Sequence, residues 1–306
     1  MKFWVGVTDN GWFNYLSNLQ VDEVNFWQPR GKVAFTNLHA GDLFLFKLKK
    51  PFNHIAGGAY FVKSTSLPLS IAWETFGEKN GASSRVNFES MIRKFSIDPD
   101  VRDPEIGCTV LTAPVFWPRD LWISDPDGFA SSIVRGRYYD SEKPEDSRLW
   151  SEVSLKLANT NQYKNMVEEE KPMNRFGNPV LVKPRLGQSA FRVLVTDAYR
   201  RKCALTGEST LPVLEAAHIL PFAEQGPNDV SNGMLLRSDF HKLFDLGMIT
   251  VTPDYKIEIS TRIREEYYNG KAYYRLHGQQ VPNLPEKIAD RPSKEFLRWH
   301  NDTRFQ

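Results

Sequence analysis

The chain has little of what marks a secreted or membrane protein. Its 306 residues include only two cysteines, Cys108 and Cys203, which lie far apart in the sequence. Two such cysteines exclude a disulfide framework or a four-cysteine zinc site, and we expect both to be buried. Apolar runs such as VFW and VLV are far shorter than the roughly 20 residues that span a bilayer. The opening MKFWVGVTDNGW also lacks the apolar segment of a signal peptide, so we expect a cytoplasmic protein with no membrane partner.

A strong net charge is also missing, because the formal charge is only +2. With 41% hydrophobic, 13% aromatic and 25% charged residues, the composition is that of a globular protein long enough for two domains. The basic residues are nevertheless unevenly spread, because residues 183–202 contain six of them against one acid. A solvated surface is the simpler interpretation of such a cluster. If the partner is DNA, its backbone would contact Arg192, Arg200, Arg201 and Lys202.

The order of predicted elements divides the chain into two α+β units. Residues 1–138 alternate short strands and helices without regular βα repetition, which predicts a mixed sheet curled toward a barrel. In this unit Gly57 and Gly58 indicate a bulge or a close backbone approach. Residues 139–184 are rich in charge and proline and are expected to form a linker with some helix at 148–168. Residues 185–306 form the second unit, with a basic and aromatic extension at its end.

One short segment of the second unit, RSDFHKLFDLG at 237–247, has the pattern of a helix that ends at a glycine. Its spacing puts His241 and Asp245 one turn apart, with Phe240 and Phe244 on the buried side. Alone, this pair would be an ordinary surface histidine with a carboxylate partner, contributing a few tenths of a kcal/mol. What precedes the helix changes that interpretation.

Two more polar residues come before this helix. His218 ends a predicted strand in LEAAHI, and Asn232 begins the next strand in NGMLLR after a long loop. This order of histidine, asparagine and histidine on a strand, loop, strand and helix resembles the HNH nuclease family across roughly residues 200 to 255. The resemblance implies a ββα-metal fold, and it includes flanking residues that have no chemical role, such as Gly233 and Leu235.

Phosphodiester hydrolysis explains why such residues would be held together. A base must take a proton from water, and a cation must offset the charge that builds on the phosphate. Neutral imidazole suits the first task, so His218 is the predicted general base. His241 and Asp245 would bind one divalent ion, although Asp245 could instead only orient His241. Asn232 would tie the loop to the strand and steady His218. The resemblance implies products with a 5′-phosphate and a 3′-hydroxyl.

The sequence departs from many HNH nucleases in two places. Where relatives carry an acid or a histidine before the general base, this chain has Ala217. The cation would then have few protein ligands and keep water, which suits Mg²⁺ or Mn²⁺, with Glu215 as a weaker candidate ligand. In CALTG only Cys203 remains of the cysteine pairs that bind zinc in many relatives, so we expect no structural zinc.

The first unit carries a second resemblance. The stretches WVGVTDNGWF, VNFWQPRG, DLFLFKL, GGAYF and AWETFGEKNGA resemble the EVE family of PUA-like domains, in the form found ahead of HNH domains in modification-dependent restriction enzymes. Such a domain would lift one modified base from the stack and hold it between aromatic rings. The predicted pocket walls are Trp12 and Trp27, with Trp73 as a third candidate. Gln28 or Asn10 would hydrogen-bond the base edge, and for each tryptophan the alternative is core packing.

Together these features predict an endonuclease that cleaves double-stranded DNA containing 5-hydroxymethylcytosine or 5-methylcytosine. Because two strands must be cut, a homodimer is expected. One alternative is a PUA-like nucleic-acid binding module whose HNH part serves only as a scaffold. Another is an HNH nuclease that does not depend on base modification.

Overall fold

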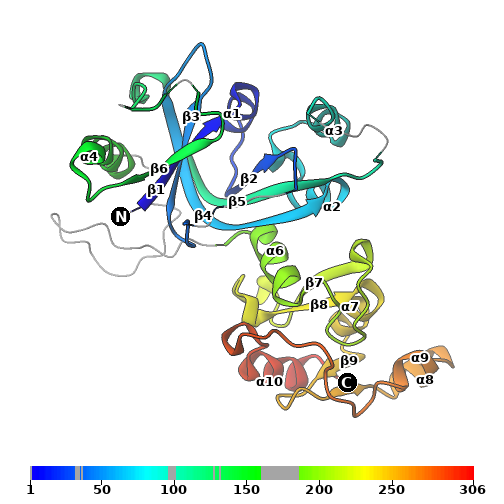
Figure 1. Ribbon diagram of the computed structural model, residues 1–306. Coiled ribbons are helices and arrows are strands. Elements are labelled where there is room, and N and C mark those ends of the chain that lie inside the picture. The colour runs from blue at the N-terminus through cyan, green and yellow to red at the C-terminus, as the bar shows by residue number, and fades with distance from the viewer. Residues whose placement is uncertain are drawn as a thin grey trace. The chain divides into compact units, whose positions relative to one another are not determined.

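The computed structural model describes residues 2–31, 35, 37–95, 101–126, 128–130, 132–159 and 186–306 (Figure 1). The chain divides into two compact units, Met1–Ala190 and Phe191–Gln306. Part of the predicted linker, residues 160–184, falls outside the described residues. Within the described ranges, every helix is too short or too polar to cross a bilayer.

The first unit is built around one mixed sheet, as the sequence predicts. Its elements are β1 (Lys2–Thr8), α1 (Asn10–Ser17), β2 (Glu23–Gln28), β3 (Leu43–Leu48), β4 (Ile55–Pro68), α2 (Leu69–Phe76), α3 (Arg85–Arg93), β5 (Glu105–Phe116), β6 (Gly136–Asp140) and α4 (Pro144–Asn159). The strand order is β2-β5-β4-β3-β1-β6, in which β1 and β3 are parallel and the other pairs antiparallel. In Figure 1 the long strands β4 and β5 curve together. The expected α+β class is confirmed.

Both faces of this sheet are buried, which explains its apolar strands. Successive side chains of a strand point to opposite faces. On β1, Phe3 and Val5 accordingly belong to one core cluster, and Trp4 belongs to the other. On β3, Leu45 belongs to the cluster of Phe3 and Val5, and Phe44 belongs to the cluster of Trp4. The sheet therefore has a core on each side.

The predicted close approach at the two glycines is confirmed. A Cβ atom on Gly57 would lie 2.1 Å from the carbonyl oxygen of Val115 on β5, so only glycine fits there. The pairing of β4 with β5 also shifts its register between Gly58 and Tyr60.

Helix α4 lies in the segment that the sequence predicts to be a linker, and it packs on the first unit. Its residues Leu149, Val153 and Leu157 recur every four positions, so they share one face of the helix. All three are buried in the core cluster that contains Phe3 and Val5. The helix begins before the predicted range of 148–168 and is described up to Asn159.

The second unit has the predicted strand, loop, strand and helix order, followed by further elements. These are α6 (Gln188–Ala198), whose first residues belong to the first unit, β7 (Leu214–His218), β8 (Gly233–Arg237), α7 (Ser238–Asp245), β9 (Ile249–Val251), β10 (Ile257–Ile259), α8 (Arg262–Tyr267), α9 (Lys271–Tyr274) and α10 (Lys294–Thr303). Strands β7 and β8 form an antiparallel hairpin in which His218 pairs with Gly233. Strands β9 and β10 form a second antiparallel pair.

Helix α7 buries the side that the sequence predicts. Phe240 is 2% exposed and Phe244 is fully buried, so His241 is left on the other side. Gly247, two residues after the end of α7, has a positive φ of 68°. A Cβ atom at this position would lie 1.9 Å from the carbonyl oxygen of Arg304, so the end of the chain packs directly against the end of α7.

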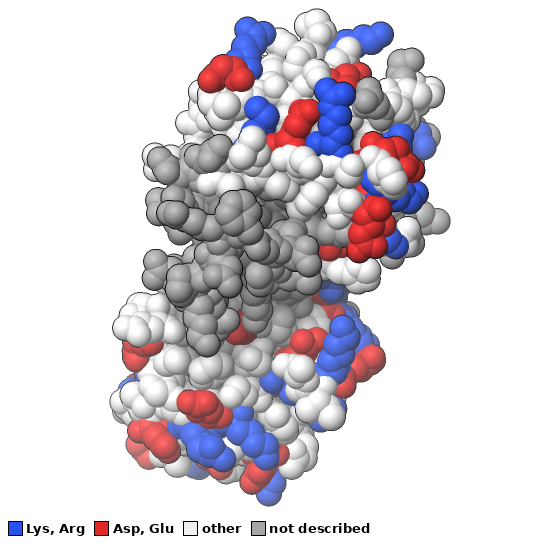
Figure 2. All heavy atoms as spheres, turned by 90° about the vertical axis from the view of Figure 1, so that its left-hand side faces the viewer, with Lys and Arg blue, Asp and Glu red and all other residues white. Residues whose placement is uncertain are grey.

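The surface carries charges of both signs. On the face drawn in Figure 2, basic and acidic side chains are interspersed over both units. This face therefore matches the small net charge and gives no reason to expect binding to a polyanion from charge alone.

Candidate active site

An aromatic ring and an amide hold His218 at the end of β7. Its imidazole stacks on Phe191, with ring centroids 3.9 Å apart and planes 11° apart. Its Nε2 lies 2.9 Å from Oδ1 of Asn228. Because an amide oxygen only accepts hydrogen bonds, Nε2–H donates here. The lone pair of Nδ1 is then available to accept a proton.

The surroundings of His218 favour the neutral imidazole. Burial lowers its pKa below the usual histidine value, because a buried imidazolium loses hydration. The hydrogen bond to Asn228 raises this pKa, the nearby His241 lowers it, and Asp245 raises it. Since lowering prevails, His218 is unprotonated at neutral pH, which is the form that a general base requires.

Asn232 is fully buried and ties the loop after β7 to the start of β8. Its Nδ2 donates to the carbonyl oxygens of Leu220 and Pro227, both at 2.9 Å. Its Oδ1 accepts from the backbone N–H of Leu220 at 2.9 Å, and its own carbonyl accepts from Ile219. The residues that follow His218 are thereby fixed, so Asn232 acts on the site through the backbone.

His241 lies between two carboxylates. Its Nδ1 is 2.6 Å from Oε2 of Glu215, which projects from β7. Its Nε2 is 3.5 Å from Oδ2 of Asp245, one turn along α7. Because Glu215 accepts the Nδ1 hydrogen, it fixes the tautomer and leaves Nε2 facing Asp245. All three side chains are partly exposed, so a substrate in solution can reach them.

Burial and the charges of neighbouring groups shift the pKa of Asp245. Burial raises its pKa above the usual aspartate value, and Glu215 raises it further. The cationic forms of His241, Arg304 and His218 lower it. His218, His241 and Glu215 thus lie close enough to Asp245 for their charges to act on it, which brings the two predicted histidines and the predicted aspartate into one cluster.

The donors of this cluster fit a divalent cation that retains water. Nε2 of His241 and the carboxylate of Asp245 offer nitrogen and oxygen, which Mg²⁺ or Mn²⁺ accept together with water or phosphate oxygens. Among the residues that the structure describes, no three His, Cys, Asp or Glu side chains are arranged to hold a metal ion. Ala217, directly before His218, is buried and offers no ligand atom.

The end of the chain supports α7 through a buried histidine, His300. This ring stacks on Phe244, with centroids 3.7 Å apart. Its Nε2–H donates to the carbonyl oxygen of Phe244, while Nδ1 accepts from the hydroxyl of Thr250. Burial lowers the pKa of His300 to about 4. Arg304, the residue that follows α10, is paired with Glu224 and lies near Asp245.

Sequence reasoning missed several of these contacts. Phe191 has the spacing of a core residue, and nothing in its pattern indicates that it stacks on the ring of His218. Asn228 lies in the irregular loop PFAEQGPNDVS, where no periodicity places a side chain. The approach of Arg304 to the cluster depends on a contact between distant parts of the chain.

The predicted DNA-backbone residues have mixed surroundings. Arg200 forms an ion pair with Glu286 at 2.6 Å, so an internal partner competes with any phosphate. Lys202 is exposed, whereas Arg192 and Arg201 are partly buried. Of the four, only Arg200 and Lys202 are exposed.

In the first unit, Trp12 is a core residue, contrary to the prediction that it forms a pocket wall. Its side chain is 3% exposed, and its Nε1–H donates to the carbonyl oxygen of Asn25 at 3.2 Å. The rings of Phe26 and Phe46 contact it edge to face. No ring face is therefore left for a base to stack on.

Trp27 and Trp73 are partly exposed and contact the same ring, that of Phe88. Each packs against Phe88, with centroids 5.7 Å and 5.9 Å away. Nε1–H of Trp27 donates to the carbonyl oxygen of Asn80 at 2.9 Å, which fixes the ring. Gln28, the next residue on β2, is also partly exposed. Trp27, Trp73 and Gln28 therefore keep solvent-exposed surface, whereas Trp12 does not.

A buried amide lies beside Trp27. Asn25 precedes it by two positions on β2, so both point to the same face. Nδ2 of Asn25 donates to Oδ1 of Asn80 at 2.8 Å. Its Oδ1 is buried and has no hydrogen-bond partner within the described part of the chain. Such an acceptor is costly unless a ligand satisfies it.

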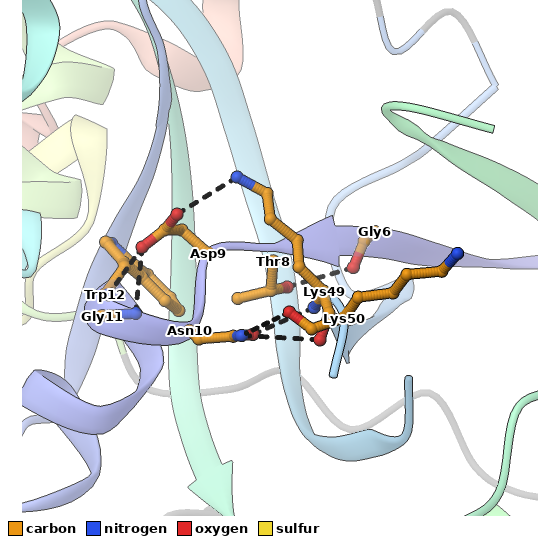
Figure 3. A network of polar contacts seen from close by, with 8 residues as sticks. All are labelled: Gly6, Thr8, Asp9, Asn10, Gly11, Trp12, Lys49 and Lys50. Carbon is orange, nitrogen blue, oxygen red and sulfur yellow. Dashed lines mark hydrogen bonds and ion pairs between the residues drawn. The ribbon is translucent and has the colours of Figure 1, made fainter. Parts of the chain in front are cut away.

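Asn10 is occupied in a backbone network at the end of β1 (Figure 3). Its Nδ2 donates to the carbonyl oxygens of Lys49 and Lys50, and its Oδ1 accepts from the N–H of Lys49 at 3.0 Å. Asp9 caps α1 and pairs with Lys49 at 3.1 Å. The amide of Asn10 thus holds the turn after β3, and these contacts compete with the predicted role at a base edge.

Comparison with known proteins assigns the second unit. Residues 203–252 match the family model described as HNH endonuclease, so the chain carries an HNH nuclease domain there. The match includes all three residues of the motif and Asp245. A comparison with curated protein sequences gives no match.

Solved structures similar to this chain include ASCH from Zymomonas mobilis and a variant of it. ASCH is 12% identical, with a TM-score of 0.34, and the alignment covers 48% of this chain and 94% of that one. The variant is 10% identical, with a TM-score of 0.34 and coverages of 48% and 96%. The modification-dependent TagI restriction endonuclease is 14% identical, with a TM-score of 0.27 and coverages of 93% and 76%.

Proposed function

We propose that this protein is a divalent-metal-dependent endonuclease that cleaves double-stranded DNA containing modified cytosine. The observation that carries the proposal is the cluster formed by His218 with a lowered pKa and His241 between two carboxylates. This cluster lies in the segment that matches the HNH family model. Its DNA substrate would be met in the cytoplasm.

His218 is the proposed general base. Its Nδ1 takes a proton from a water molecule whose oxygen then attacks phosphorus, and the bond from phosphorus to the 3′ oxygen breaks. The 3′ oxygen leaves with a proton from solvent, which gives a 5′-phosphate and a 3′-hydroxyl. The contacts to Phe191 and Asn228 keep the imidazole in the orientation and tautomer that this step needs.

Nε2 of His241 and the carboxylate of Asp245 would hold Mg²⁺ or Mn²⁺. When bound, such an ion offsets the negative charge on the phosphate and on the leaving oxygen. Glu215 would hold His241 in place through Nδ1, which is a supporting role instead of the metal-ligand role considered from the sequence. Asn232 would keep the backbone after His218 in position.

The first unit would select the modified base. A base lifted from the duplex would stack on Trp27 or Trp73, each stack contributing about 1 to 3 kcal/mol. The buried Oδ1 of Asn25 would accept from the exocyclic amino group of cytosine, and Gln28 would contact another edge. The mark would be 5-hydroxymethylcytosine or 5-methylcytosine, and a homodimer would supply one nuclease site for each strand.

The test is cleavage of three matched duplexes that differ only in unmodified, methylated or hydroxymethylated cytosine. With Mg²⁺ or Mn²⁺ we expect cutting of a modified duplex, with 5′-phosphate ends, and no cutting after addition of EDTA. Equal cutting of all three duplexes would refute the reading role of the first unit. Tight binding without scission, unchanged by His218→Ala, would instead indicate a binding module.

A further inference from the structure

Helices α8 and α9 form a hairpin that presents two tyrosines to solvent. Tyr267 ends α8 and is 60% exposed, and Tyr268 follows it and is 90% exposed. In Figure 1 the two helices project from the rest of the second unit. Large aromatic side chains at the tip of a projection gain nothing from burial, so their presence calls for another explanation.

The backbone of Tyr268 makes the choice of tyrosine more unusual. Its φ is 54°, in the left-handed region that glycine and asparagine adopt more readily. Its N–H donates to the carbonyl oxygen of Arg264, so the strained conformation is fixed by the end of α8. A smaller residue would suit folding better, and a strained position of this kind points to a function.

The hairpin is held rigidly. Gly270 has a φ of 116°, and a Cβ atom there would lie 2.7 Å from the buried Ile263, so the turn packs closely. The hydroxyl of Tyr274 donates to the carbonyl oxygen of Ser260 at 2.8 Å and accepts from the N–H of Arg264 at 3.1 Å. The two exposed tyrosines are thus carried by a preorganised support, which lowers the entropy cost of binding.

Helix α9 of this hairpin packs on α7, the helix of the candidate active site. Tyr273 of α9 contacts Phe240 edge to face, with centroids 5.3 Å apart. Its hydroxyl donates to Oδ2 of Asp239 at 3.2 Å. Asp239 and Phe240 directly precede His241 on α7. The tip is therefore coupled to the cluster that we propose to cut the strand.

The charges around the tip suit a nucleic acid. Residues 262–275 contain four basic and two acidic side chains, and the basic Arg264, Lys271 and Arg275 are exposed. Arg262 is paired with Glu266 at 2.7 Å, so three basic side chains and one acidic side chain lie outside this pair. Exposed aromatic rings beside basic side chains are the combination that binds nucleic acids by stacking and by phosphate contacts.

We infer that Tyr268, supported by Tyr267, stacks on or inserts between bases of the DNA held at the nuclease cluster. This inference rests on the proposed function, because it takes DNA as the partner. Stacking on a base face does not depend on the modification of a neighbouring cytosine, so the contact would act on modified and unmodified duplexes alike.

The test compares Tyr268→Ala, Tyr268→Trp and the control Ile288→Ala, each combined with His218→Ala so that the DNA stays intact. Ile288 is 81% exposed on the same unit, so its replacement removes an equally accessible apolar side chain. Binding is measured by fluorescence anisotropy on duplexes with and without hydroxymethylcytosine. Unstacking is followed with 2-aminopurine placed beside the cut position.

We expect Tyr268→Ala to weaken binding to both duplexes about tenfold and to abolish the change in 2-aminopurine fluorescence that the parent protein causes. Tyr268→Trp should restore both, Ile288→Ala should change neither, and melting temperatures should not fall. Unchanged binding by Tyr268→Ala would overturn the inference, as would a loss of self-association without loss of DNA binding. If the parent protein binds no DNA, the proposed function fails as well.

Discussion

The two units show how differently polar and aromatic residues can be placed from a sequence. In the second unit, His218, His241 and Asp245 were predicted as one site and lie within electrostatic range of each other. In the first unit, Trp12 and Trp27 were predicted as one pocket, yet Trp12 is in the core and Trp27 is partly exposed. The polar residues predicted as one cluster thus lie close together, whereas the two tryptophans predicted as one pocket differ in burial.

The largest expected effect separates catalysis from binding in the second unit. His218→Ala removes the proposed base, so cleavage should fall by about a thousandfold, within the range for loss of a general base. DNA affinity and Mn²⁺ binding should persist, because neither depends on Nδ1 of His218. Single-turnover cleavage and anisotropy measure the two quantities, and a variant that still cuts at the parent rate would contradict the proposed role.

A pair of tryptophan variants sharpens the contrast within the first unit. Trp12→Ala should lower the free energy of unfolding by about 3 to 5 kcal/mol, because it empties a site between buried rings. Trp27→Ala should instead weaken binding to modified DNA, with a cost of about 1 to 3 kcal/mol. Denaturant unfolding and anisotropy distinguish the two. If both variants lose only stability, Trp27 is a core residue too.

The stability of the second unit should depend on pH through His300. Its folded pKa of about 4 lies below the usual value, so the unfolded chain binds the proton first. The full stability is present above about pH 6.5 and decreases as the pH falls toward 4, by about 3 kcal/mol at most. Urea unfolding between pH 7 and 4 measures this decrease. His300→Asn should show a smaller decrease, and an equal one would exclude His300 as its source.

The smallest effect concerns Glu215, which contacts Nδ1 of His241 and has the proposed supporting role. Glu215→Gln keeps the shape but loses the charge, so Mn²⁺ affinity should fall by roughly 10 to 100-fold. Asp245→Asn serves as the comparison, because it removes a proposed ligand and should weaken Mn²⁺ binding more. Isothermal titration gives both affinities. The reverse order would exchange the roles of the two carboxylates.

Most of the architecture could be predicted because it depends on local patterns. The buried side of α7, the hairpin that ends at His218 and the close approach at Gly57 all follow from spacing and residue type. The mixed sheet follows from the irregular order of strands and helices. The packing of α4 was missed, because its charged surroundings outweigh its three buried residues in the sequence pattern.

The parts of the site that escaped prediction depend on contacts across the chain. Asn228 reaches His218 from an irregular loop, and Arg304 approaches Asp245 only because the chain end packs on Gly247. Periodicity carries no information about either contact. Core and pocket tryptophans have the same sequence signature, so only the folded chain separates them.

The most direct test of the central claim is a crystal of His218→Ala with a duplex and Mn²⁺, in which anomalous scattering locates the metal. We predict one ion about 2 Å from Nε2 of His241 and from a carboxylate oxygen of Asp245, with a phosphate oxygen and water molecules completing its shell. The scissile phosphorus should face the position of the deleted imidazole. An ion bound away from His241, or a phosphate that position 218 cannot reach, would contradict the account.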